Sequence, residues 1–262
     1  MRQDSTVALY SGAMLRAMQD RRDFLRIATC GAALALGGRA RDARAQPPAG
    51  SPVKIGMVGA GREGSALGAL FVEARHPVMF SSRHPENLKD LVARLGPSAQ
   101  AGTVEQAIDF GDVVAMVVPY MAIEQIGKTH GAALARKALV MDVSNPIARR
   151  DGEELVKWVG EQGGAGLASA KLLPGARIVR AFNAIGAGRL ADLAHRAGER
   201  VGVPIAGDDP KAIAMAETLI RAIGFEPVLV GGLPMGKYLV PGTPLGGEHS
   251  AAELRRIAAG LR

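Results

Sequence analysis

Residues 53–64 of this chain read Val53-Lys54-Ile55-Gly56-Met57-Val58-Gly59-Ala60-Gly61-Arg62-Glu63-Gly64. The first six residues are mostly apolar and predict a short buried strand, and the glycines after them predict a tight turn. Beyond the turn, apolar residues recur at helical spacing, at Ala66, Leu67, Leu70, Phe71 and Ala74. The stretch therefore predicts a strand, a glycine turn and a helix in immediate succession.

The turn itself has the pattern G-x-G-x-x-G, formed by Gly59, Ala60, Gly61, Arg62, Glu63 and Gly64. In that pattern the first glycine permits the tight turn, the second lets the backbone approach a diphosphate, and the third allows close packing of helix and strand. The start of the helix adds free N–H groups that attract negative charge. This context favours a dinucleotide-binding turn over the alternative, glycines that merely fold a loop.

The rest of the chain alternates short apolar runs with helical periodicity. Further strands are predicted at 78–80, 112–118, 138–142, 178–181, 203–206 and 227–230, with helices at 85–95 and near 250–261. Near-continuous apolar strands separated by helices indicate a mostly parallel sheet covered on both faces. The expected fold class is therefore α/β, a Rossmann-type doubly wound sheet forming a single compact domain over residues 53–262.

The N-terminal 45 residues have the layout of an export signal. Arg21-Arg22 precede a short apolar stretch at 27–36, and Ala43-Arg44-Ala45 ends the segment. The segment resembles a twin-arginine signal peptide, the bacterial route that carries folded proteins. We expect cleavage after Ala45, a linker at 46–52, a periplasmic location and no stable membrane insertion after cleavage. The alternative is an uncleaved leader that anchors the protein in the membrane.

Most of the chain's net positive charge comes from this leader. The whole chain carries a net charge of +7, but residues 1–45 hold 8 Arg against 4 Asp, which leaves 24 basic and 21 acidic residues in the remainder. A body so close to balance is not expected to bind nucleic acid. The single cysteine, Cys30, also lies in the leader. The mature chain therefore has no disulfide, thiolate nucleophile or cysteine metal ligand.

The end of the second predicted strand indicates which dinucleotide would bind. NAD-specific folds place Asp or Glu there to bind the ribose hydroxyls. This chain instead has Ser81-Ser82-Arg83-His84. Hydroxyl groups and a guanidinium suit the 2′-phosphate of NADP. The prediction is an NADP cofactor, and the alternative is that Arg83 is a solvated loop charge.

Together these motifs resemble the NADP oxidoreductases that reduce or oxidise the deazaflavin coenzyme F-420. The same fold forms the cytosolic domain of six-transmembrane ferric reductases and opens pyrroline-5-carboxylate reductase. The motifs that carry the resemblance are Lys54–Gly64, Ser81-Ser82-Arg83, Val117-Val118-Pro119, Asp142-Val143-Ser144-Asn145-Pro146, Arg180-Ala181-Phe182-Asn183 and Ala206-Gly207-Asp208-Asp209.

The resemblance implies a role for each motif. It implies that Ser82 and Arg83 hold the 2′-phosphate and that Val118 and Pro119 end a strand beside the nicotinamide. It also implies that the Asn145-Pro146 and Phe182-Asn183 loops line the pocket, and by analogy with relatives it suggests a homodimer.

No catalytic residue can be assigned from the sequence. There is no Tyr-x-x-x-Lys pair, and His76, His130 and His195 suit structural or solvated positions. Two alternatives are open for His84, a hydrogen bond to the cofactor or simple exposure, and His249 near the C-terminus could reach a pocket. His249 and Glu248 alone do not make a metal site, so no metal is expected. Hydride transfer to a flavin-like ring needs mainly stacking, orientation and exclusion of water, which small apolar side chains supply.

The favoured activity is therefore hydride transfer between NADPH and a small flavin-like or deazaflavin acceptor. The predicted substrate pocket contains Tyr120, Phe182, Asn183, Ile185 and Met235, although ordinary core packing would also explain the apolar members. Two alternatives stay open. One is an imine or ketone reductase with a proton donor such as Tyr120 or His249, and the other is a non-catalytic NADP sensor or partner-binding protein.

Overall fold

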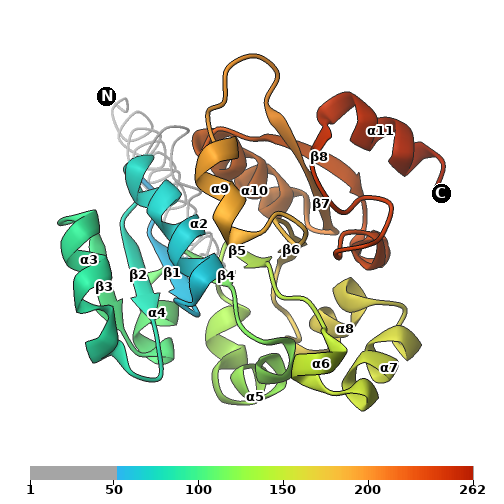
Figure 1. Ribbon diagram of the computed structural model, residues 1–262. Coiled ribbons are helices and arrows are strands. Elements are labelled where there is room, and N and C mark those ends of the chain that lie inside the picture. Colours follow the sequence, from blue (N-terminus) through green and yellow to red (C-terminus); the bar gives the residue numbers. More distant parts are fainter. Residues whose placement is uncertain (1–51, 262) are drawn as a thin grey trace, which may run out of the picture. The chain divides into compact units, whose positions relative to one another are not determined.

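The structure, a computed structural model, describes residues 52–261 (Figure 1). The predicted leader (1–45) and the linker up to residue 51 lie outside the described residues. Export, cleavage after Ala45 and a periplasmic location therefore stay predictions. Within the described part of the chain, no helix is long and apolar enough to cross a membrane.

Nine strands of the described residues form one sheet in the order β3-β2-β1-β4-β5-β6-β7-β8, with β9 paired to β7. All neighbouring pairs from β3 to β6 are parallel, whereas β7 is antiparallel to β6 and to β9 and parallel to β8. The strands are β1 (Ile55–Val58), β2 (Val78–Ser81), β3 (Ala99–Gly102), β4 (Val113–Met116), β5 (Leu139–Asp142), β6 (Ile178–Arg180), β7 (Val201–Gly207), β8 (Glu226–Gly231) and β9 (His249–Ser250).

Helices connect successive strands and cover both faces of the sheet (Figure 1). The α-helices are α2 (Arg62–Glu73), α3 (Lys89–Leu95), α4 (Val104–Phe110), α5 (Ile123–Leu134), α6 (Ala148–Asp151), α7 (Glu153–Glu161), α8 (Ala165–Leu172), α9 (Ala187–Leu193), α10 (Pro210–Ala222) and α11 (Ala251–Ala259). Short 3₁₀ helices are η1 (Pro85–Leu88), η2 (Tyr120–Ala122) and η3 (Leu233–Tyr238).

The alternation of side chains along the central strands divides the core into two layers. On β4, Val113 and Ala115 pack into the cluster that holds the apolar faces of α2, α9 and α10. Val114 and Met116 point the other way, into the cluster with α4, α5 and α8. Both sets are buried, because a parallel sheet with helices on both faces exposes neither side to water.

The chain reverses its direction of sheet growth after β3, so β1 and β4 lie side by side with their crossovers on opposite sides. The crevice at such a switch point, outside the carboxyl ends of the strands, is where ligands bind in open α/β sheets. The loops after β1, β2, β4, β5 and β6 meet at this edge. The predicted fold class, a Rossmann-type, mostly parallel α/β sheet in one compact domain, is confirmed.

Three local features differ from the sequence prediction, and the first is the two-residue strand β9, which has no apolar run to indicate it. Strand β3 was not expected, since Ala-Gln-Ala-Gly has neither β-branched nor aromatic residues, and it forms as an edge strand against β2. The helix expected at 85–95 is divided into a 3₁₀ turn, η1, and α3. Proline at the start of η1 fixes the first turn, as predicted.

Candidate functional site

The glycine turn between β1 and α2 is the first part of the candidate site. Gly59 has φ +102°, a backbone conformation that residues other than glycine rarely adopt. A β-carbon on Gly64 would lie 1.9 Å from the carbonyl oxygen of Gly59, so helix and turn pack too closely for any other residue. At Gly61, by contrast, a β-carbon would meet no atom within 4 Å. The outer face of the turn is therefore open, which fits a diphosphate approaching the backbone.

The start of α2 faces the same opening. Gly61 is the N-cap residue of this twelve-residue helix and contributes no side-chain hydrogen bond to it. The N–H groups of the first helical turn therefore have no capping side chain from that position, and they carry the positive end of the helix dipole. Arg62, the first helical residue, is exposed beside them. This end of the site is suited to an anion.

Ser81, at the end of β2, holds the glycine turn by two hydrogen bonds. Its hydroxyl accepts a hydrogen bond from the backbone N–H of Gly59 at 3.2 Å, and its carbonyl oxygen accepts one from Ala60 at 2.9 Å. The residue is fully buried. Ser81 thus lies against the backbone of the turn, while the next residues of the loop reach the surface.

Ser82, Arg83 and His84 form the outer part of that loop. The Ser82 hydroxyl accepts a hydrogen bond from the backbone N–H of His84 at 3.0 Å, and the His84 ring lies 3.1 Å from a carboxylate oxygen of Glu86. Arg83 is exposed, and its guanidinium has no hydrogen-bond or ion-pair partner among residues 52–261. A single guanidinium is thus available at the edge where the sequence predicted one, with Glu86 as a nearby carboxylate that the sequence analysis did not consider.

The loops after β4 and β5 lie next along the edge. Val118 is half-buried and Pro119 is exposed, and the backbone N–H of Val118 points to the Ser144 hydroxyl at 3.4 Å. That hydroxyl donates to the carbonyl oxygen of Met116 at 3.2 Å. Ser144 therefore ties the end of β4 to the loop after β5, so the two loops form one continuous surface.

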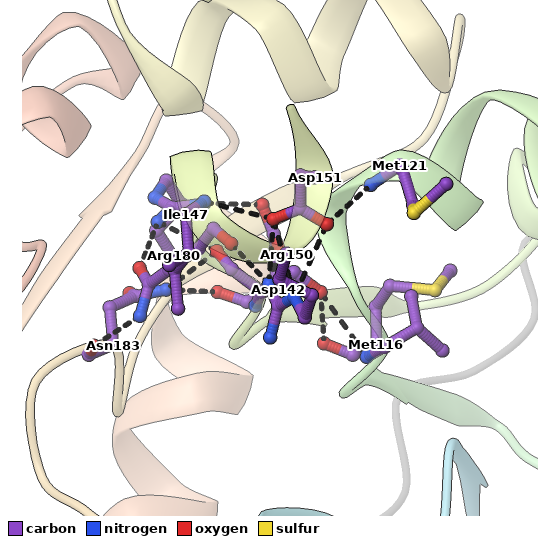
Figure 2. Close-up of polar contacts among 11 residues, drawn as sticks. Met116, Met121, Asp142, Ile147, Arg150, Asp151, Arg180 and Asn183 are labelled. Carbon is purple, nitrogen blue, oxygen red and sulfur yellow. Dashed lines mark hydrogen bonds and ion pairs between the residues drawn. The ribbon is translucent and has the colours of Figure 1, made fainter. Parts of the chain in front are cut away.

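Beneath these loops lies a buried ion pair between β5 and β6 (Figure 2). The Arg180 guanidinium donates to Oδ2 of Asp142 at 2.6 Å, and both side chains are fully buried. The same carboxylate accepts hydrogen bonds from the Ser169 hydroxyl at 2.7 Å and the Ser144 backbone N–H at 2.9 Å. These additional donors satisfy a carboxylate that burial would otherwise destabilise.

Tyr120 extends this buried network toward α8. Its hydroxyl donates to the carbonyl oxygen of Ala165 at 2.9 Å and lies 2.9 Å from the Ser169 oxygen. Burial, together with the negative charge of Asp142, raises the pKa of Tyr120 well above its ordinary value. The hydroxyl is therefore occupied by internal hydrogen bonds and does not face the edge of the sheet.

Arg180 also holds Asn145, the first of the two asparagines that the sequence assigned to the site. Its second nitrogen donates to the Ser144 carbonyl oxygen at 3.0 Å and to Oδ1 of Asn145 at 3.2 Å. The Asn145 amide donates to the carbonyl oxygen of Asn183, and the Asn183 amide donates to the carbonyl oxygen of Asp142 at 3.1 Å. The loops after β5 and β6 are thus brought together, with the half-buried Pro146 directly after Asn145.

Asp151 connects a third loop to this edge (Figure 2). Its buried carboxylate accepts hydrogen bonds from the backbone N–H groups of Ile147, at 2.8 Å, and Met121, at 3.3 Å, and pairs with Arg150 at 2.9 Å. Burial alone would raise the pKa of Asp151, but the hydrogen bonds from Arg150, Ile147 and Met121 hold it below its ordinary value. No sequence pattern pointed to Asp151, because its partner Met121 lies 30 residues away and the contacts to Ile147 and Arg150 are ordinary local ones.

Four residues of the predicted substrate pocket lie in three different parts of the fold. Phe182 and Ile185 are buried in the main core, and the Phe182 ring packs edge-on to Phe225 with centroids 5.4 Å apart. Met235 packs near β8 and α11, against a separate cluster. Tyr120 lines a cavity of about 440 Å³ together with Met121, Glu124, Asp151, Leu155, Trp158 and Leu172. The structure therefore brings Asn145 and Asn183 together at the edge, but it does not gather Tyr120, Phe182, Ile185 and Met235 into one cavity.

A second cavity, of about 340 Å³, lies beside the glycine turn and is lined by Arg62, Glu63, Gly186, Ala187, Gly188 and Arg189. Oxygen Oε1 of Glu63 is buried without a hydrogen-bond partner in the described structure. Burial raises the pKa of Glu63 to about 7, although a backbone hydrogen bond from Ala187 and the charge of Arg62 partly offset this. The sequence motif placed Glu63 in the turn, but only the fold shows that its carboxyl group reaches α9.

These features are those of the dinucleotide-binding class of α/β domain. A family model described as NADP oxidoreductase, coenzyme F420-dependent, matches residues 54–146. The match runs from the start of β1 through the loop after β5, so it contains the glycine turn, the end of β2 and Asn145. No curated protein matches the chain.

Solved structures share the fold over most of the domain. A hypothetical protein of Sinorhizobium meliloti is 27% identical with a TM-score of 0.61, over 76% of this chain and 95% of that one. A protein from an Arthrobacter species, named as a candidate F420-dependent NADP-reductase, is 18% identical with a TM-score of 0.56, over 71% and 87% of the two chains. A variant imine reductase of Myxococcus stipitatus in complex with NAD+ is 16% identical with a TM-score of 0.51, over 80% of this chain and 60% of that one.

Proposed function

We propose that this chain is an NADP(H)-dependent oxidoreductase that transfers hydride between NADPH and a flavin-like or deazaflavin acceptor. The observation that carries the proposal is the pairing of an open glycine turn, where a β-carbon on Gly61 would meet nothing, with an unpaired Arg83 at the end of the neighbouring strand. The similarity of residues 54–146 to a family of NADP oxidoreductases supports it.

The residues present fit the cofactor along one edge. The first turn of α2 would hold the diphosphate, and Ser82 with Arg83 would hold the 2′-phosphate. Val118, Pro119 and Asn145 would border the nicotinamide, which supplies the hydride when bound. The buried network under Asn145 would keep that part of the edge rigid, and so orient the ring and exclude water from it.

The arrangement of possible proton donors supports a flavin-like acceptor over a ketone or an imine. The Tyr120 hydroxyl is bound inside the fold, and Nε2 of His249 lies 2.9 Å from the Gly246 carbonyl oxygen. The two proton donors that the sequence suggested for a carbonyl or imine reductase are therefore engaged elsewhere. Hydride transfer between two planar rings needs no such donor beside the acceptor.

Titration calorimetry with NADP and NAD tests the cofactor, and Arg83→Ala tests its recognition. We expect wild-type protein to prefer NADP, and Arg83→Ala to bind NADP at least about tenfold more weakly with little change for NAD, since a charge-assisted hydrogen bond contributes about 1.5–3 kcal/mol. Arg94→Ala, which removes an arginine from α3, is the matched control. Equal affinity of the wild-type protein for the two nucleotides would contradict NADP specificity.

The acceptor is tested by mixing the NADPH complex with riboflavin, FMN, FAD or a deazaflavin and following the loss of reduced nicotinamide absorbance. We expect acceptor-dependent oxidation with at least one of the four. Tight NADPH binding with no oxidation by any of them would instead favour a non-catalytic nucleotide-binding role.

A further inference from the structure

Glu63 supplies the acidic group at the glycine turn, and its Oε1 atom is buried although the residue as a whole is half-buried. Glu63 is the second residue of α2, two positions after the open Gly61, and it lines the cavity between the start of α2 and the start of α9. Its Oε1 atom has no hydrogen-bond partner among residues 52–261. A buried carboxylate oxygen without a donor is costly when charged, whereas a protonated carboxyl group avoids that cost.

Few positive charges oppose a negative charge on Glu63. Arg62, on the same helix, lowers its pKa only as the smallest of three influences. Arg189 of α9 lines the same cavity, but it pairs with Glu248 at 2.9 Å and with Asp192 of α9 at 3.7 Å. Strands β1 and β2 also pack on α2, and they carry no charged residue. Helix α3 packs on it as well, but its charged residues do not contribute to the pKa shift of Glu63; these are Lys89, Asp90 and Arg94. The ionised form of Glu63 is therefore stabilised mainly by the backbone hydrogen bond from Ala187, and only weakly by charged side chains.

A diphosphate at the first turn of α2 would add negative charge next to this group. Like charges in a poorly solvated site disfavour ionisation, so the bound anion would shift Glu63 further toward its protonated form. We propose that binding of a dinucleotide phosphate takes up one proton from solvent onto the Glu63 carboxylate, which becomes a neutral carboxylic acid in the complex. This inference rests on the proposed function, because it requires the nucleotide to occupy the glycine turn.

The size of the effect depends on pH. Because burial raises the pKa of free Glu63 to about 7, the group is only partly ionised near neutral pH and becomes largely ionised as the pH rises further. Proton uptake per bound nucleotide should therefore increase with pH above neutrality and approach one proton. By the same linkage, affinity should fall as pH rises above 7, by up to about tenfold per pH unit.

The experiment is calorimetric titration of the full chain with NADP at pH 8, in two buffers that differ in their heat of ionisation. The dependence of the observed heat on the buffer gives the number of protons taken up. We compare wild type with Glu63→Gln, which keeps the shape of the side chain but cannot ionise. We expect the variant to take up close to one proton fewer and to bind with little pH dependence. Subtracting the two removes any contribution of the 2′-phosphate itself.

Glu73→Gln is the matched control, because Glu73 lies at the exposed end of the same helix. We expect it to take up as many protons as wild type. If Glu63→Gln and wild type take up equal numbers of protons, the inference is wrong while the proposed function stands. If wild type binds neither NADP nor NAD, the proposed function fails and the inference fails with it.

Wild type alone supplies a second measurement if Glu63→Gln does not fold. Between pH 7 and pH 8.5 a phosphate group with a pKa of about 6 is already ionised, so it contributes little change in that range. Proton uptake by the wild-type protein should still approach one proton at the upper end of the range. Uptake that stays near zero throughout would overturn the proposal without reference to any variant.

Discussion

The two ends of the candidate site are built in different ways. At the glycine turn and the end of β2, the groups that would meet a ligand are backbone N–H groups and one exposed guanidinium, and they make few contacts with the rest of the fold. At the ends of β5 and β6, the polar side chains are buried and bonded to one another, around the fully buried pair of Asp142 and Arg180.

This difference separates binding from stability. Groups that are open in the free protein can gain interactions only from a ligand, so changing them should alter affinity and leave unfolding almost unchanged. Groups that bond to one another inside the fold have most of their interactions without a ligand, so changing them should alter the free energy of unfolding. In this network only Nε of Arg180 and Oδ1 of Asn183 are buried without a partner among the described residues. The comparison therefore predicts opposite behaviour for variants at the two ends.

The largest effect is expected for Arg180→Met. This change leaves the Asp142 carboxylate buried without its cation and removes the donor to Asn145, which should cost about 3–5 kcal/mol of the free energy of unfolding. Denaturant unfolding of the full chain measures it. The control is Lys128→Met, which breaks the exposed ion pair between Lys128 and Glu124, whose charged atoms lie 2.6 Å apart. Here the loss in the free energy of unfolding should be about 0.5 kcal/mol. Similar costs for the two variants would show that the buried pair is no more important than a surface one.

Gly61→Ala should show the opposite behaviour. The free protein has room for the methyl group, so the free energy of unfolding should change by no more than about 1 kcal/mol. The same methyl group would occupy space that the diphosphate needs, and NADP affinity should fall by at least about tenfold. The measurement is titration calorimetry beside thermal unfolding. Gly160→Ala, at another position with no atom near the added carbon, should leave affinity unchanged. Unchanged affinity in Gly61→Ala would place the ligand elsewhere.

The same contrast explains which parts of the molecule could be predicted from the sequence. The glycine turn is local: a strand, three glycines and a helix lie within about twenty residues, and each glycine has a separate steric reason. Arg83 could be found because it follows a recognisable strand. The fold class followed from the apolar strands, and two strands went unrecognised: β3, without β-branched residues, and the two-residue β9.

The buried network could not be predicted in this way. Asp142 and Arg180 are 38 residues apart, and Tyr120 meets Ser169 across 49 residues. No local pattern records which acid and base face each other, because pairing depends on the order of strands and the packing of α8. The positions of the aromatic and apolar residues proposed for a substrate pocket could not be predicted for a similar reason. Phe182 and Ile185 belong to the core, and apolar character alone does not distinguish a core position from a pocket.

The smallest effect is expected for Tyr120→Phe, at the margin of the buried network. The change removes one hydroxyl, but Ser169 keeps its bond to Asp142, and the Ala165 carbonyl oxygen is already part of the first turn of α8. The loss should therefore be close to that of a single hydrogen bond, about 1 kcal/mol.

Two measurements on this variant separate a structural role for Tyr120 from a catalytic one. Denaturant unfolding should show the loss of about 1 kcal/mol, while Tyr238→Phe, whose hydroxyl makes no hydrogen bond to the described residues, should show almost none. NADPH oxidation by a flavin should proceed at a similar rate in both variants, because the Tyr120 hydroxyl faces α8 and not the edge of the sheet. Loss of turnover in Tyr120→Phe, with the fold intact, would instead assign the hydroxyl to proton transfer and favour an imine or ketone substrate.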